Sequence, residues 1–474
     1  MHQNRRAQRR NAGGMGCFPA RLRRLGRAVC AALAVVGAVV APVSAYAQDL
    51  PLIRDTEIES LLQDYARPIF KIAGLGSQNI AIRIVRHDAF NAFVVDGRNV
   101  FINTGTIMMA KTPNEVIGVI AHETGHIAGG HMAALRERIA RDQTKSLLMK
   151  ILGIGLIVAG GVAGGDAREI GGLGQGVMLG SDDVIMRSIL ADRRAQESSA
   201  DQAGLKYLNA TRQSGRGMLE TFERFANQEY VSDTYKDPFV RTHPVASDRL
   251  AQLRELVQKS PYYNERDPPQ LQQRHDLVRA KISGYLERPQ TVFNRYPQTD
   301  NSLPARYARA IARYFQSGIQ ASLPEAEALI RERPDNPYFL ELKGDVLMRS
   351  GKSAEAIEPL RRAYRMTKGA SLIGVRLAQG LLALEGQQVT DEAIELCRKA
   401  VVEDENPQAY RLLGTAYYKR GRLPEADLAT AQAHFLEGDV KQAQIFAKRA
   451  QVKLKPGSPE WIRADDILKY KTPT

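Results

Sequence analysis

A repeat in the last third of the 474-residue chain limits its possible folds most strongly. Four residue pairs recur there at one offset of 70 residues, namely Asn336 and Asn406, Gly344 and Gly414, Ala356 and Ala426, and Ala363 and Ala433. Seventy residues correspond to two periods of 35, and a repeat of that length is typical of stacked helical hairpins. The repeat therefore predicts an all-α solenoid over residues 301–474.

Alanines and glycines in the same region support this prediction. The seven-residue alanine spacing recurs twice more, at Ala393 and Ala400 and at Ala443 and Ala450. Glycines fall where one helix would turn into the next, at Gly351, Gly386, Gly421 and Gly438. The period is close to that of the tetratricopeptide unit, so we expect three to five such units from Pro304 to Lys469. The alternative is a non-repetitive helical bundle with chance alanine spacing.

The first 47 residues differ in composition from the rest of the chain. They contain eight arginines and no acidic residue, then an apolar run over Ala28–Val43, and finally Ala45-Tyr46-Ala47. This order is typical of a secretory signal peptide, and we expect cleavage after Ala47. An uncleaved membrane anchor is the alternative, but the apolar run is short for a bilayer core of roughly 30 Å.

Removal of this segment changes the charge and the cysteine content. The whole chain has a formal charge of +14 and the signal carries +8, so the mature protein keeps 14 − 8 = +6. A charge of this size does not indicate nucleic-acid binding. Cys17 and Cys30 lie in the signal, which leaves only Cys397 and no internal disulfide. Stability must then come from packing and from any bound metal.

Residues 48–260 read as an α+β domain that is mainly helical with a small sheet. Residues 80–85 partly alternate like a strand, and the apolar runs 92–95 and 99–102 flank Asp96-Gly97, which predicts a β-hairpin. Residues 261–300 contain a Pro-Pro pair and a helix-like stretch over 270–286, so we interpret them as a linker with one connecting helix.

A glycine-rich apolar segment over residues 147–180 allows two interpretations. Its most apolar part, Ile151–Gly165, has 15 residues and is too short to span a membrane. One interpretation is a core helix interrupted by glycines. The other is a mobile lid or a membrane-surface segment, which would give the protein a peripheral membrane contact.

The strongest chemical signal is the HExxH pattern at residues 122–126. His122 and His126 are four residues apart on a predicted buried helix, so both imidazoles can bind one zinc ion from the same face. Glu123 would act as the general base that takes a proton from the attacking water. A catalytic zinc needs a third protein ligand, and Glu197 on a second helical stretch is the candidate.

Two further residues near these ligands need separate interpretation. Asp201 follows Glu197 by one helical turn and could hold a ligand imidazole, although it could also be a solvated acid. His131 lies five residues after His126, about 140° around a helix, so we expect it to point away from the metal. The position at which some HExxH enzymes place a third histidine is Met132 here.

His243, in the run Arg241-Thr242-His243-Pro244, has three possible roles. It could be a fourth metal ligand, a transition-state donor or a structural turn histidine. A fourth protein ligand would complete the tetrahedron and exclude water, so catalysis would then require His243 to move away. In that case the residue would be an inhibitory switch.

Three separated motifs carry a family resemblance, namely HExxH from His122, ExxAD from Glu197 to Asp201, and the His243-Pro244 pair. In this order they resemble those of the Ste24-like and HtpX-like zinc peptidases of the gluzincin group. The export signal and the repeats make the chain similar to the BepA-type periplasmic proteases that maintain outer-membrane β-barrel assembly. The similarity covers nearly all of the mature chain.

This resemblance implies one zinc ion per chain, bound by His122, His126 and Glu197, with Glu123 as base and His243 as regulatory fourth ligand. It also implies a periplasmic endopeptidase that acts on protein substrates and contacts the β-barrel assembly machinery through its repeats. The hairpin that ends at residues 99–105 would present an edge strand to an extended substrate. The rival interpretation is a non-catalytic tetratricopeptide scaffold or chaperone with a structural zinc site.

Overall fold

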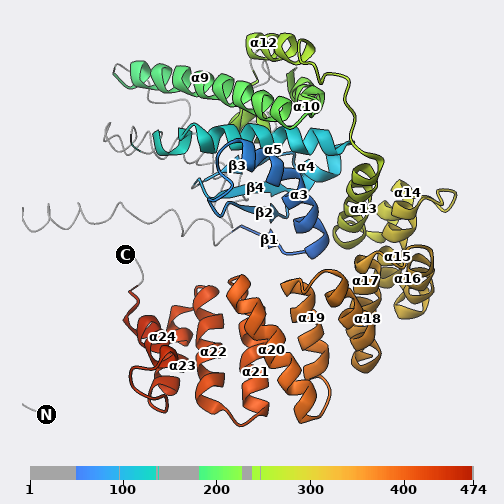
Figure 1. Cartoon of the computed structure of the whole chain (residues 1–474), viewed down its shortest axis with the longest axis vertical. Coiled ribbons are helices and arrows are strands. Elements are labelled where there is room, and N and C mark those ends of the chain that lie inside the picture. Colours follow the sequence, from blue (N-terminus) through green and yellow to red (C-terminus); the bar gives the residue numbers. More distant parts are fainter. Residues whose placement is uncertain are drawn as a thin grey trace, which may run out of the picture. The chain divides into compact units, whose positions relative to one another are not determined.

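The computed structural model describes residues 50–95, 97–134, 137, 181–226, 238–245 and 247–471 (Figure 1). The predicted signal peptide and the apolar segment 147–180 lie outside these residues. Within the described ranges, no helix combines the length and the apolar character needed to cross a membrane.

The N-terminal part is an α+β structure with a four-stranded sheet, as expected. Its elements are β1 Leu52–Ile53, α3 Thr56–Ile72, β2 Ala81–Val85, β3 Ala92–Val94, β4 Asn99–Asn103, α4 Thr104–Met109, α5 Pro113–Ala128, α9 Ser181–Ala210, α10 Arg216–Phe225, α11 Pro238–Thr242 and α12 Ser247–Gln258. Alternate residues of β2, β3 and β4 share one core with the apolar side chains of α3 and α5. The helices therefore cover one face of the sheet, because side chains alternate between the two faces of a strand.

The strand order β1-β2-β4-β3 shows which strand of the predicted hairpin lies at an edge. β3 pairs with β4 in antiparallel fashion, and Gly97 in the turn between them has φ of 74°. β4 also pairs in parallel with β2, so both of its sides are occupied. Among the described strands, the free edge of the hairpin is therefore β3 and not the segment over residues 99–105.

The HExxH segment lies on α5, which is buried along most of its length. The helix begins at Pro113, and the side chain of Thr112 caps it by accepting a hydrogen bond from the backbone N–H of Glu115 at 3.4 Å. Its apolar residues, such as Val116 and Ile120, are less than 1% exposed. A helix fixed in this way on all sides holds its polar residues in place, because they cannot move without disturbing the core.

The segment interpreted as a linker contains a helix that belongs to two cores. α13, Pro269–Leu286, contributes Val278 and Ile282 to the core of the α+β part. The same helix contributes Leu277 and Ala280 to the core that begins the helical region. The connecting helix is therefore a packed element of both regions.

The remaining residues form consecutive helical hairpins, in agreement with the predicted solenoid. After α14 Pro289–Arg295, the helices are α15 Leu303–Ser317, α16 Ile319–Glu332, α17 Pro337–Arg349, α18 Ser353–Met366, α19 Ser371–Leu382, α20 Gln387–Glu403, α21 Pro407–Lys419, α22 Leu423–Leu436, α23 Val440–Gln451 and α24 Pro459–Lys469. From α15 onward they form five pairs, at the upper end of the expected number of units.

The residues that recur every 70 positions have the same structural role in both copies. Asn336 and Asn406 cap α17 and α21, and each side chain accepts a hydrogen bond at 2.9 Å from a backbone N–H two residues later. Gly351 and Gly421 follow these helices with φ of 76° and 70°, a conformation that favours glycine. The 70-residue spacing of these asparagines and glycines therefore marks the beginnings and ends of two equivalent helices, α17 and α21.

Candidate metal centre

Small residues allow two helices to pack closely against each other at the HExxH segment. α5 and α9 lie side by side (Figure 1), and a Cβ atom at Gly125 would lie 2.8 Å from the carbonyl oxygen of Ala200. Such a contact is too short for a real side chain, so only glycine fits at this position. The close approach brings Glu197 of α9 to the two histidines of α5.

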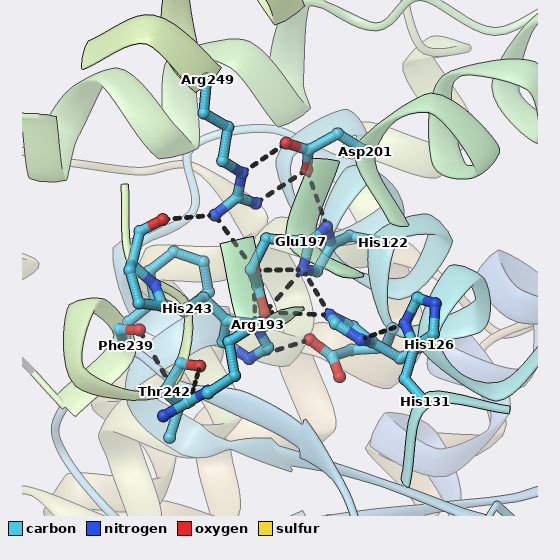
Figure 2. Close-up of polar contacts among 12 residues, drawn as sticks. His122, His126, His131, Arg193, Glu197, Asp201, Phe239, Thr242, His243 and Arg249 are labelled. Atoms are coloured by element: carbon cyan, nitrogen blue, oxygen red, sulfur yellow. Dashed lines mark hydrogen bonds and ion pairs between the residues drawn. The ribbon is translucent and has the colours of Figure 1, made fainter. Parts of the chain in front are cut away.

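Four side chains converge on one point, as Figure 2 shows. His122, His126, Glu197 and His243 are all buried and offer ligand atoms that lie within 4.8 Å of one another. The Nε2 atoms of His122 and His126 are 3.1 Å apart. Each of these nitrogens is 3.4 Å from an oxygen of Glu197. The sequence-predicted ligands are thus brought together from three separate segments.

The spacing of these donors fits a tetrahedral zinc site. Atoms that bind one zinc ion at about 2.0 to 2.1 Å in tetrahedral geometry lie about 3.3 Å from one another. The observed separations among His122, His126 and Glu197 are 3.1 to 3.4 Å. Two imidazoles and a carboxylate are also the donor types found in catalytic zinc sites. The residues present therefore suit the metal that the sequence predicts.

His243 occupies the fourth corner of this arrangement. It directly follows α11, and its Nδ1 lies 3.3 Å from His122 Nε2 and 3.2 Å from a Glu197 oxygen. The other ring nitrogen, Nε2, is 3.2 Å from the carbonyl oxygen of Ala92 on β3. Because its N–H can donate to that carbonyl, Nδ1 is left with a lone pair that points at the other donors. His243 thus closes the site in this structure.

Asp201 and Arg249 form the layer behind the donors. An oxygen of Asp201 is 2.9 Å from Nδ1 of His122, on the side of the ring opposite to the other donors. The guanidinium of Arg249 contacts both oxygens of Asp201, with one bond of 2.8 Å, and its Nη1 lies 3.0 Å from Glu197. Asp201 is therefore a buried partner of the His122 imidazole and not a solvated acid.

Arg249 was not expected from the sequence. It lies on α12 and is 8% exposed, and its Nη1 also donates to the carbonyl oxygen of Pro244 at 2.8 Å. The one available signal was charge balance, because buried Glu197 and Asp201 require a cation or hydrogen-bond donors nearby. Sequence alone does not identify which of the chain's many arginines provides it.

Glu123 faces the same point but makes few contacts of its own. Its side chain is 1% exposed, and its Oε1 has no hydrogen-bond partner among the described residues, although His243 Nε2 lies 3.4 Å away. Burial raises the pKa of Glu123 to about 7, against the effect of His122 and His126. A carboxylate with a free oxygen and a pKa near neutrality is suited to accept and release a proton.

The carboxylate of Glu197 is held in its charged form. Burial favours the neutral acid, but the interactions of the carboxylate with His243, Arg249 and His126 outweigh it, so the pKa of Glu197 lies well below its usual value. Arg249 likewise lowers the pKa of Asp201 against the effect of burial. Two ionised carboxylates on this side of the site favour the binding of a cation.

His131 lies next to the site without joining it. Among the described residues, the group that could hold a metal does not include it. Its Nδ1 lies 2.9 Å from Nδ1 of His126, on the far side of that ring from the other donors (Figure 2). The side chain is 9% exposed, so His131 is a packed histidine outside the donor set, and it contacts His126 from the side away from the donors.

Comparisons with known proteins agree with this geometry. Residues 53–257, which contain all four donors, match the model of peptidase family M48, and residues 307–371 and 377–434 match a tetratricopeptide repeat. The chain is 24% identical over 401 residues to the beta-barrel assembly-enhancing protease of Yersinia pestis. The aligned residues cover 81% of this chain and 76% of that protein. The protein of the same name from Escherichia coli K12 is 22% identical over 425 residues, or 88% and 83% of the two chains.

A shorter relative matches the first part alone. Metalloprotease LoiP of Escherichia coli K12 is 27% identical over 200 residues, which is 41% of this chain and 71% of that protein. The family resemblance drawn from the three motifs is thus confirmed, and it extends through the repeats in the longer relatives. The chain has a peptidase family M48 domain followed by tetratricopeptide repeats, and it is a metalloprotease.

Proposed function

We propose that the chain is an exported, zinc-dependent endopeptidase of envelope protein quality control. The observation that carries this proposal is the set of donors His122, His126 and Glu197 at 3.1 to 3.4 Å, with the basic carboxylate Glu123 beside them. The arginine-rich N-terminus and the apolar run before Ala47 support export to the periplasm.

The chain's own residues provide the steps of peptide hydrolysis. When zinc is bound, it supplies the positive charge that activates water and stabilises the oxyanion of the scissile carbonyl. Glu123 takes the proton from the attacking water and passes it to the leaving amine. Asp201 and Arg249 hold His122 and Glu197 in place, so that the donors are positioned before substrate arrives.

The position of His243 supports a role as a switch. It closes the site and, through Nε2, contacts the carbonyl oxygen of Ala92 on the edge strand. The carbonyl of the preceding residue, Asn91, accepts a hydrogen bond from Asn103 on β4, so the carbonyl of Ala92 points to the free side of β3. His243 must leave before water and an extended substrate can occupy the site.

The central test is the substitution Glu123→Gln. It removes the base but none of the proposed ligands, so zinc content should stay at one ion per chain. Casein hydrolysis should fall by about 100- to 10,000-fold. Metal content is measured on the purified exported protein, and His122→Leu provides the matched control that should lose both metal and activity. Wild-type activity in the Gln variant would refute Glu123 as the base.

A second candidate function follows from the closed arrangement. With His243 as a permanent fourth ligand, the zinc site would be structural and the chain would act as a tetratricopeptide scaffold or chaperone. His243→Ala separates the two functions. A switch predicts severalfold faster casein hydrolysis or self-cleavage with zinc retained, whereas a structural ligand predicts loss of zinc and lower thermal stability.

The names of the longer relatives suggest the physiological substrates. Both are called beta-barrel assembly-enhancing proteases, so we propose that this chain degrades misassembled outer-membrane β-barrel proteins and assists their assembly. The repeats would then bind the assembly machinery, because helical repeats offer extended protein-binding surfaces. The purified enzyme should cleave an unfolded β-barrel protein faster than the same protein folded in detergent, and equal rates would contradict this role.

A further inference from the structure

The ring of His126 has a partner on each of its two nitrogens. Nε2 lies 3.1 Å from His122 Nε2 and 3.4 Å from Glu197, so it faces the centre of the donor set. Nδ1 lies 2.9 Å from Nδ1 of His131, with the ring planes at 79°. The two histidines are therefore in hydrogen-bond contact, on the side of His126 away from the donors.

The chain after α5 is shaped to make this contact. The helix ends at Ala128, and Gly130 has φ of 63°, which turns the backbone and brings His131 back toward His126. Gly129 lies beneath the returning ring, because a Cβ there would be 2.4 Å from Nε2 of His131. Any side chain at position 129 would displace the imidazole, so this turn leaves room for the ring.

Proton positions follow from the geometry. When Nε2 of His126 provides its lone pair to a metal, the proton of the ring must reside on Nδ1. That N–H points at His131, whose Nδ1 must then accept the hydrogen bond while its own proton lies on Nε2. His122 has the equivalent contact with the carboxylate of Asp201. Each proposed ligand imidazole of α5 thus has its own acceptor.

We propose that His131 is a positioning residue that holds His126 in the orientation and tautomer needed to bind zinc. The inference rests on the proposed zinc site. His131 contributes a neutral acceptor where Asp201 contributes a charged one, so it orients its ligand without adding negative charge to the site. Partners of this kind change metal affinity by about 10- to 100-fold in other proteins.

Two substitutions of similar size separate the hydrogen bond from packing. His131→Asn keeps an acceptor close to the position of Nδ1, and His131→Leu removes it. Zinc affinity is measured by competition with a chelator, and the thermal melting temperature of the metal-free protein is measured in parallel. We expect zinc to bind about 10- to 100-fold more weakly in the Leu variant and within about threefold of wild type in the Asn variant. The melting temperatures of the two metal-free variants should be similar.

Each outcome decides the proposal. Wild-type zinc affinity in the Leu variant, or equal loss in both variants, would overturn it. If the Leu variant does not fold, the tautomer of His131 in the zinc-loaded wild-type protein is measured by nitrogen NMR. A proton on Nε2 supports the role, and a proton on Nδ1 contradicts it. His126→Leu is included because unchanged zinc binding in that variant would refute the zinc site itself, a result distinct from failure of the His131 contact.

Discussion

Arg249 balances the charge of the proposed zinc site. Its guanidinium contacts both oxygens of Asp201 and one oxygen of Glu197, and these carboxylates are 3% and 4% exposed. Buried carboxylates without partners are strongly unfavourable, because their charge is removed from water with little compensation. The planar fork of arginine can serve two carboxylates at once, which a lysine could not do with the same geometry.

Replacement of this guanidinium should therefore destabilise the fold. We expect Arg249→Met to lower the free energy of unfolding by about 3 to 5 kcal/mol, because two buried carboxylates lose their cation. The measurement is denaturant unfolding of the metal-free protein. The matched control is Arg254→Met on the same helix, where the side chain is 46% exposed and pairs with Glu223, and a change below about 1 kcal/mol is expected. Equal effects in both variants would show that Arg249 has no special role.

At this scale, the sequence predicts residues that share a local pattern and misses those that do not. His122, Glu123 and His126 are recognisable because helical spacing places them together, and Glu197 and Asp201 because they are one turn apart. Arg249 is 48 residues from Asp201, and only the folded packing of α12 brings it there. The turn that returns His131 to His126 was missed because the angular argument assumed that the helix continued beyond Ala128.

The helix pair α5 and α9 shows how an element's packing controls the site. Gly125 and Ala200 are in backbone contact, so any added atom must separate the helices that hold His126 and Glu197. The separation of these donors, 3.4 Å, leaves little room for displacement.

A single methyl group tests this packing. We expect Gly125→Ala to lower the free energy of unfolding by about 1 to 3 kcal/mol through overpacking. Casein hydrolysis should fall by at least about tenfold, because the donors shift relative to one another. Gly76→Ala is the control, since its added Cβ would meet Lys71 at an ordinary 3.6 Å. Full activity in the Gly125 variant would mean that the helices can separate without disturbing the site.

The elements themselves were largely predictable, whereas their pairing was not. The hairpin at residues 92–103 and the helix boundaries in the repeats follow from turn residues, caps and small-residue spacing, all of which are local signals. The parallel pairing of β2 with β4 is a contact between segments separated in the sequence, and it makes β3 the edge strand. No local pattern encodes that choice.

Across the whole molecule, a buried charge cluster joins the M48 domain to the first repeats. Lys281 of α13 lies 2.8 Å from Asp55, 3.4 Å from Glu57 and 3.1 Å from Glu341 of α17. The hydroxyl of Tyr307 on α15 donates to Glu57 at 3.0 Å. Burial raises the pKa of Glu57 to about 7, although Lys281 opposes the shift.

This shift predicts a pH dependence of stability. A carboxyl group with a raised pKa in the folded state binds its proton more tightly there, so its stabilising contribution is complete below about pH 4.5 and is lost as the pH rises through about 7. The glutamine side chain in the variant Glu57→Gln has no charge at any pH, so the variant should not lose this part of the free energy of unfolding, which is on the order of 3 kcal/mol. The variant should therefore be more stable than wild type at pH 8. The free energy of unfolding of both proteins is measured by denaturant unfolding from pH 5 to 8. Glu59→Gln on the same helix is the control, and equal slopes for wild type and Glu57→Gln would contradict the assignment.

The double membership of α13 also affects how the chain can be divided. A fragment that stops at residue 260 would lack Val278 and Ile282, and with them part of the interior of the peptidase. It would also lack His275, whose ring contacts the buried hydroxyl of Tyr65 at 3.2 Å. Anyone who wishes to isolate the protease from its repeats should therefore retain the chain through Leu286, and even then the helix would expose the apolar side that normally meets α15.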